Sequence, residues 1–149
     1  MNGRALIKVS IMNRRKALAK FLDCNSRDIE ETERYYNGLE YDGDYYMVLT
    51  DEEADEEAQE NIINDIWTFY TSFIMNYIPS SIPEEVVLIL QDKCEGGNEP
   101  LRELIGDNIG EFIEDAISAD GRSHFLNTYD GEENGVELNG EYYYIYRMN

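Results

Sequence analysis

Apolar positions along this chain recur at two spacings, and each spacing predicts a different kind of element. Residues 14–22 place Ala17, Leu18, Phe21 and Leu22 on one helical face, which predicts a short amphipathic helix with a basic outer side. A second apolar stripe runs from residue 51 to residue 78. At 1.5 Å per residue, this helix of about 28 residues would be about 42 Å long. We expect it to be the single long helix at the centre of the fold.

Two further helical stretches follow, separated from each other by glycines. Pro83 opens the first, over residues 83–95, and Gly96 with Gly97 ends it. Pro100 opens the second, over residues 100–121, where apolar residues repeat every three or four positions. Its internal glycines weaken this second prediction.

Two other segments alternate aromatic or β-branched residues around a two-residue turn signal. Gly38–Leu49 and Gly135–Tyr146 match in residue type at nearly every position, with Asp42-Gly43 and Asn139-Gly140 at their turns. The match is compatible with duplication of one segment and with convergence of two segments on the same hairpin sequence. An isolated hairpin is only marginally stable in water, so we expect both to form one four-stranded antiparallel sheet. The predicted fold class is α+β, with helices packed on a small sheet built from two β-hairpins.

The length and composition of the chain predict one folded domain over residues 1–149. An apolar content of 42% and an aromatic content of 12% are too high for a disordered acidic tail. Cys24 and Cys94 are too few for a disulfide scaffold, so we expect free thiols. The sequence shows no secretory signal and no apolar run of membrane-spanning length. We therefore expect a cytoplasmic protein.

Charge changes this picture, because the net charge is −20 and its distribution is uneven. Residues 1–20 contain six basic residues and no acid, whereas residues 21–149 contain all 32 acids and six bases. We expect Arg14, Arg15 and Lys16 to pair with acids of the same chain or of a partner subunit, which leaves a homodimer open. The acidic remainder repels phosphate and anionic lipid, so we expect neither nucleic acid nor membrane as a direct partner. A cationic partner fits better.

The residues available for catalysis are few. His124 is the only histidine, the cysteines lack Cys-x-x-Cys spacing, and Gly96-Gly97 lacks the Lys and Ser/Thr of a phosphate loop. Chance proximity among 32 carboxylates makes any pair of acids uninformative. We expect no enzyme activity and no cofactor.

The strongest local charge signal is a cluster of seven acids within ten residues at the start of the predicted long helix. Thr50 and Glu53 have the spacing of a capping box. Residues four apart on a helix form parallel rows of carboxylates, which resemble the stepped charge of a nucleic-acid backbone. The alternative is a solvated helix start that the helix dipole favours. The candidate partner-binding residues are Asp51, Glu52, Glu53, Asp55, Glu56, Glu57 and Glu60.

Residues 130–141 come close to the pattern of a twelve-residue calcium loop. Acid, amide, glycine and glutamate occupy its first, fifth, sixth and twelfth places. However, the segment after Glu141 reads as a strand, whereas the calcium loop needs a helix there. We expect no metal site. The candidate cation ligands are Asp130, Glu132, Asn134 and Glu141.

Several stretches resemble small acidic proteins predicted in bacteriophage genomes. They are Leu18–Leu22, Glu40–Tyr41, Tyr46–Glu56, Asp120–Leu126 and Tyr129–Glu133, together with the Tyr-Ile-Tyr-Arg end. That resemblance carries no activity. In size and charge the chain is also similar to phage-encoded DNA mimics, which act in anti-restriction and anti-CRISPR roles. This similarity implies a non-enzymatic inhibitor of a basic, nucleic-acid-binding defence protein in the host cytoplasm. The alternatives are an acidic structural or regulatory phage protein and a cation-binding module.

Overall fold

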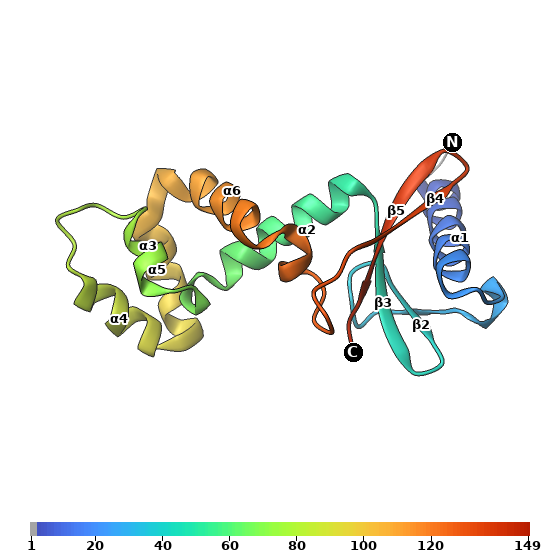
Figure 1. Ribbon diagram of the computed structural model, residues 1–149, viewed down its shortest axis with the longest axis horizontal. Coiled ribbons are helices and arrows are strands. Elements are labelled where there is room, and N and C mark those ends of the chain that lie inside the picture. Colours follow the sequence, from blue (N-terminus) through green and yellow to red (C-terminus); the bar gives the residue numbers. More distant parts are fainter. Residues whose placement is uncertain (1–2) are drawn as a thin grey trace. The chain divides into compact units, whose positions relative to one another are not determined.

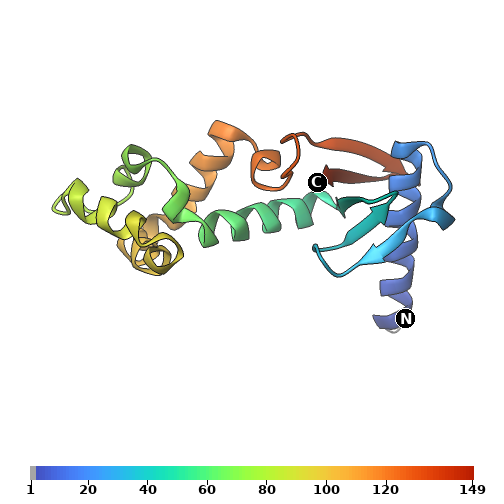
Figure 2. The same cartoon turned by 90° about the horizontal axis from the view of Figure 1, so that it is seen from below.

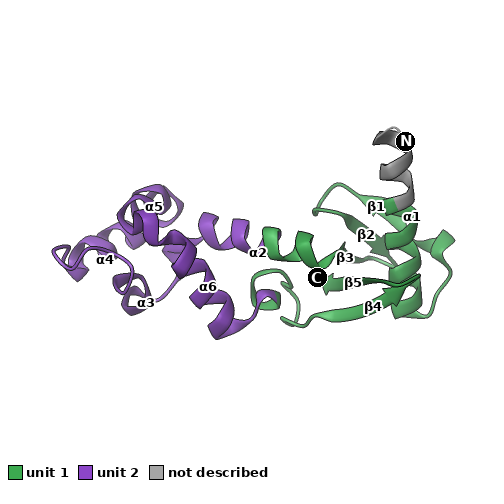
Figure 3. Ribbon diagram, turned by 90° about the horizontal axis from the view of Figure 1, so that it is seen from above, with its two compact units in different colours: residues 1–56, 123–149 green, residues 57–122 purple. Residues whose placement is uncertain are grey.

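The structure is a computed structural model that describes the backbone of residues 3–149, with side chains from residue 10 onward. The chain divides into two compact units (Figure 3). Unit 1 comprises Met1–Glu56 and Ser123–Asn149, and unit 2 comprises Glu57–Arg122. The single domain expected over residues 1–149 stays a prediction, and each unit is described by itself.

Unit 1 is a five-stranded antiparallel sheet with a helix against one face, so the predicted α+β class is confirmed (Figure 1). The strand order is β1-β2-β3-β5-β4. The expected sheet had four strands, and the fifth is the short edge strand β1, whose sequence Glu-Glu-Thr carries no apolar alternation. The elements are α1 (Gly3–Leu22), η1 (Ser26–Asp28), β1 (Glu30–Thr32), β2 (Gly38–Tyr41), β3 (Asp44–Leu49), the start of α2 (Asp51–Asn64), η5 (Arg122–Phe125), β4 (Asn134–Leu138) and β5 (Glu141–Arg147).

Two-residue turns set the register of the sheet between β2 and β3 and between β4 and β5. Tyr41 faces Asp44 across the Asp42-Gly43 turn, and Leu138 faces Glu141 across the Asn139-Gly140 turn. The φ angle is positive at all four turn residues, at 50° and 83° in the first turn and 53° and 83° in the second. Aspartate, asparagine and glycine tolerate this region best, which explains their use here. Strands β3 and β5 pair with each other and join both halves into one sheet.

The core of unit 1 lies between α1 and the sheet (Figure 2). Ala17 and Leu18 of α1 are fully buried against it. The sheet residues in this core alternate along each strand, as a half-buried strand requires. They are Leu39, Tyr46, Val48, Val136, Tyr143 and Ile145. Met47, Leu49 and Tyr146 point to the opposite face and are also buried. The central strands β3 and β5 are therefore covered on both faces.

The basic N-terminal region is a longer helix than the sequence predicts, because α1 begins at Gly3 and not near residue 14. Two of the three expected ion pairs are confirmed within the chain. Arg14 pairs with Glu53 at 2.7 Å, and Arg15 pairs with Glu31 at 3.3 Å. Lys16 is exposed and has no ion pair among the residues that the structure describes.

Unit 2 is entirely helical in its described elements, and it corrects the expected long helix. Helix α2 ends at Asn64, and the stretch up to residue 78 continues as two short helices. The elements are the end of α2, then η2 (Ile66–Thr68), α3 (Thr71–Met75), α4 (Glu84–Asp92), η3 (Cys94–Gly97), α5 (Asn98–Ile105), η4 (Gly106–Asn108) and α6 (Ile109–Asp120).

The break after α2 is stabilised by amide side chains from later in the chain. Asn98 donates to the carbonyl of Ile63 at 2.8 Å and accepts from the backbone N–H of Trp67 at 3.2 Å. Gln91 donates to the carbonyls of Trp67 and Phe69 at 3.1 and 2.6 Å. These bonds satisfy backbone groups that a continuous helix would have paired internally. The prediction was wrong because the apolar stripe does not reveal such distant partners.

The helix expected over residues 100–121 is also divided. Gly106 has a φ of 54°, which ends α5, and α6 starts at Ile109.

Phe112 of α6 packs its ring against Phe69, Phe73 and Tyr77, with ring centroids 5.0–5.2 Å apart. The Tyr77 hydroxyl donates to Asp115 at 2.5 Å. Burial, with this bond and the nearby acids, raises the pKa of Tyr77 to about 12.

Two further predictions were that the cysteines are free thiols and that the chain has no apolar segment of membrane-spanning length. Cys24 and Cys94 are both free, as predicted. Within residues 3–149, none of the helices combines the length and the apolar character needed to cross a membrane.

Candidate functional site

Helix α2 starts with the capping box that the sequence predicts. The backbone N–H of Glu53 donates to the Thr50 hydroxyl at 3.3 Å, and the Thr50 N–H donates to the Glu53 carboxylate at 2.8 Å. Asp51, Glu52 and Glu53 occupy the first turn. Negative charge there interacts favourably with the helix dipole, so the cluster stabilises the start of its own helix.

The seven acids of the cluster do not share one environment. Ala54, Ala58 and Ile62 are fully buried and form the inner stripe of α2. Five of the acids are exposed, namely Asp51, Glu52, Asp55, Glu56 and Glu60. Among these, Glu52, Glu56 and Glu60 follow one another at intervals of one turn, about 6 Å of rise each. We call these three residues the α2 acidic row.

Glu53 turns inward and belongs to the interior of unit 1. Its carboxylate receives two bonds from the Arg14 guanidinium, at 2.7 and 2.9 Å, and one from the Asn37 amide at 3.2 Å. Arg14 is only 7% exposed, and it also donates to the carbonyl of Val48 at 2.7 Å. Burial alone would raise the pKa of Glu53, but the bonds from Arg14 and Thr50 outweigh it and lower that pKa. The Arg14–Glu53 pair therefore ties α1, β3 and α2 together.

Glu57 is the second member of the cluster that is not fully exposed. Its pKa is raised, first by partial burial and then by repulsion from Glu60. Glu53 is therefore used within the fold, and Glu57 is partly buried beside Glu60, whereas Glu52, Glu56 and Glu60 of the α2 acidic row are exposed.

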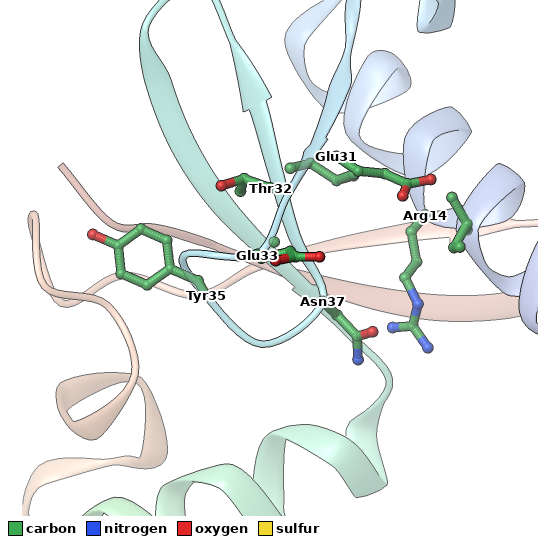
Figure 4. Close-up of a pocket in the computed structure, with 9 residues that line it drawn as sticks. Arg14, Glu31, Thr32, Glu33, Tyr35 and Asn37 are labelled. Carbon is green, nitrogen blue, oxygen red and sulfur yellow. The ribbon is translucent and has the colours of Figure 1, made fainter.

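A pocket of about 350 Å³ opens at Arg14, and no motif in the sequence predicts it (Figure 4). Arg14 from α1 and Asn37 from the β1–β2 connection form part of its wall, with the carboxylate-bearing residues Glu31 and Glu33. Arg14 already binds Glu53, so its charge is compensated and gives no free anchor for an anion. The one available signal was Asn37, whose φ of 48° lies in a region where asparagine is enriched.

The candidate cation ligands are only partly brought together. Asp130, Glu132 and Asn134 line a pocket of about 260 Å³ that also contains Arg147. Glu141 does not line this pocket and accepts instead from the Tyr143 hydroxyl at 3.1 Å. A guanidinium among the ligands opposes a second cation. Among the described residues, no group of three or more acids, histidines or cysteines is arranged to hold a metal ion.

The side chains considered for catalysis, those of His124 and the cysteines, do not belong to the acidic cluster of α2. His124 is exposed, and its ring lies 5.0 Å from that of Phe125. Burial raises the pKa of the Cys24 thiol, which reduces its reactive thiolate fraction. That the chain is not an enzyme stays a prediction.

We compared the chain with protein families, curated proteins and solved structures. No family model, curated protein or solved structure matches this chain significantly.

Proposed function

We propose that this chain is a non-enzymatic, phage-encoded inhibitor that mimics the charge of nucleic acid. Its partner is a basic, nucleic-acid-binding defence protein in the host cytoplasm, such as a CRISPR effector or a restriction enzyme. The observation that carries the proposal is the α2 acidic row, whose three carboxylates are exposed on one face of a capped helix.

A rigid helix suits this role because it presents charges at fixed intervals. Within the row, successive carboxylates are about one turn apart along the axis, and the exposed residues Asp51 and Asp55 repeat this interval. A groove that binds phosphates is lined by lysine and arginine, and carboxylates can pair with the same side chains. The alternative remains that these acids only solvate α2. The two readings differ in how binding responds to competing nucleic acid and to salt.

The test is DNA cleavage by purified restriction enzymes and CRISPR effectors in the presence of the protein. We expect inhibition of at least one enzyme, relieved by excess substrate DNA and weakened as salt rises. The variant Glu52→Gln/Glu56→Gln/Glu60→Gln removes three charges and keeps the helix propensity nearly unchanged. Exposed contacts contribute about 0.2–1 kcal/mol each, so inhibition should weaken by roughly 3- to 100-fold.

A matched variant controls for net charge alone. Glu99→Gln/Glu103→Gln/Glu114→Gln removes three exposed carboxylates from α5 and α6. We expect it to inhibit as the wild type does. Equal loss in both variants would mean that total charge, not the α2 acidic row, drives binding. Inhibition that DNA cannot relieve would overturn mimicry.

A further inference from the structure

Helix α4 exposes apolar side chains that its neighbours leave uncovered. Its sequence has five consecutive apolar residues, from Val86 to Leu90, yet only Val87 is buried. Leu88 is 49% exposed and Ile89 is 59% exposed. A helix that is apolar on every side is normally buried, so this exposure is unusual in a chain with such a strongly charged composition.

A third exposed side chain lies next to this helix. Tyr70 is 86% exposed, and hydrogen bonds hold the residues on either side of it to Gln91 of α4. Gln91 donates to the carbonyl of Phe69 at 2.6 Å and accepts from the Thr71 hydroxyl at 2.6 Å. Because Gln91 lies one helical turn from Leu88, these bonds hold the backbone on both sides of Tyr70 to the face of α4 next to Leu88. We call Tyr70, Leu88 and Ile89 the α4 patch.

Acidic residues stand at both ends of the α4 patch. Glu84 and Glu85 are exposed one turn before Leu88 and Ile89, and Asp92 is exposed one turn after Leu88. Within the described residues 84–93, Lys93 is the one basic residue. Unit 2 as a whole has fourteen acids against three bases, a net charge of −11. The patch is therefore apolar at its centre and negative around it.

This combination selects one kind of partner. A second copy of the same surface would bring like charges together, and phosphate or an anionic membrane would be repelled for the same reason. A purely ionic partner would leave the apolar side chains in water. We propose that the α4 patch binds an amphipathic basic segment of a partner protein. Its apolar side chains cover Leu88, Ile89 and Tyr70, and its lysines or arginines face Glu84, Glu85 and Asp92.

The proposal does not depend on mimicry by α2, and a defined probe tests it. The probe is a fluorescent helical peptide of about 18 residues, with leucine on one face and lysine elsewhere. Two comparison peptides replace either the leucines by serine or the lysines by glutamate. We expect the intact chain to bind the lysine–leucine peptide at least tenfold more tightly than either, as measured by fluorescence anisotropy.

Variants of the intact chain then locate the site. Leu88→Gln/Ile89→Gln should weaken binding of the lysine–leucine peptide by tenfold or more, while Glu84→Gln/Glu85→Gln should weaken it less and reduce its salt dependence. Met12→Gln changes an apolar residue of similar exposure, 54%, in unit 1 and should have no effect. Circular dichroism confirms that each variant is folded.

Three results would overturn the proposal. They are equal binding of the serine peptide, unchanged binding by Leu88→Gln/Ile89→Gln, and self-association of the wild type that this variant abolishes. The variant Glu52→Gln/Glu56→Gln/Glu60→Gln should still bind the peptide. Loss of enzyme inhibition there with retained peptide binding would separate the two surfaces, so either proposal can fail alone.

Discussion

Glu53 and Glu57 lie one turn apart on α2, yet their surroundings move the pKa values of the two carboxyl groups in opposite directions. Hydrogen bonds from Arg14 and Thr50 overcome the burial of Glu53, whereas Glu57 has partial burial and the repulsion of Glu60. Since a pKa shift between the folded and unfolded states changes stability, the two residues have opposite effects on folding.

Replacing Glu53 by glutamine should destabilise the protein by about 2–4 kcal/mol, because the buried Arg14 guanidinium loses its counter-charge. The pKa of Glu53 is lowered, so its contribution is fully present above its ordinary value of 4.5 and is lost as pH falls through the lowered pKa. Urea denaturation of wild type and variant at several pH values measures this. A difference that stays constant down to the acid limit would contradict the assigned pKa direction.

Replacing Glu57 by glutamine should leave the protein equally stable or more stable at neutral pH. The pKa of Glu57 is raised in the folded protein, so folding favours the protonated carboxyl group. This contribution to stability is present at low pH and is lost as pH rises through the raised pKa. The gain from the variant should therefore vanish below pH 4.5, the ordinary pKa. The same denaturation series checks it, and clear destabilisation at neutral pH would show an unrecognised contact of Glu57.

At the scale of the elements, the helix boundaries of unit 2 depend on close backbone approach as much as on residue propensity. Gly97, which ends η3, is buried, and a methyl group there would lie 1.7 Å from the carbonyl oxygen of Leu90. Gly110, in the first turn of α6, has open space around it. The same residue type is thus required at one position and dispensable at the other.

This difference predicts opposite results for one substitution at two sites. Gly97→Ala should destabilise by about 1–3 kcal/mol or more, because backbone and not a flexible side chain has to move. Gly110→Ala should stabilise by about 0.5–1 kcal/mol, since alanine loses less backbone entropy in a helix. Thermal unfolding of both variants makes the comparison. Equal effects would indicate that Gly97 and Leu90 lie farther apart in solution.

At the scale of the whole molecule, repulsion between acids opposes folding in both units. Unit 1 has eighteen acids and nine bases, a net charge of −9, beside the −11 of unit 2. The ion pairs Arg14–Glu53, Arg15–Glu31 and Arg147–Asp44 involve three of these nine bases, and the net charge of −9 remains after all nine are counted. A partner that neutralises the exposed acids would therefore also relieve repulsion within the chain.

Sodium chloride should therefore raise the free energy of unfolding. The screening length falls from about 10 Å at 0.1 M to about 3 Å at 1 M, which weakens repulsion between exposed acids more than the buried Arg14–Glu53 pair. Glu52→Gln/Glu56→Gln/Glu60→Gln should be more stable than wild type at low salt and should gain less from added salt. Urea denaturation at each salt concentration measures both. A fall in wild-type stability with salt would show that favourable ion pairs dominate.

Features that depend on neighbouring residues could be predicted from the linear sequence. The turns at Asp42-Gly43 and Asn139-Gly140, the capping box of α2 and the inner stripe through Ala54 and Ala58 all follow from residue type and spacing within a few positions. The net charge and its uneven distribution also follow directly from the residues. Local sterics and short-range hydrogen bonds decide such features, so a linear pattern contains them.

Only the tertiary structure decided where distant groups meet. Asn98 ends α2 by bonding Ile63, 35 positions away, and Arg14 draws Glu53 inward from 39 positions away. Strand β1 has no pattern of its own and exists through its pairing with β2. The two side-chain cases pair a buried or partly buried polar group with a partner that the chain path brings near, and burial favours such pairing. The linear sequence contains both partners but not the distance between them.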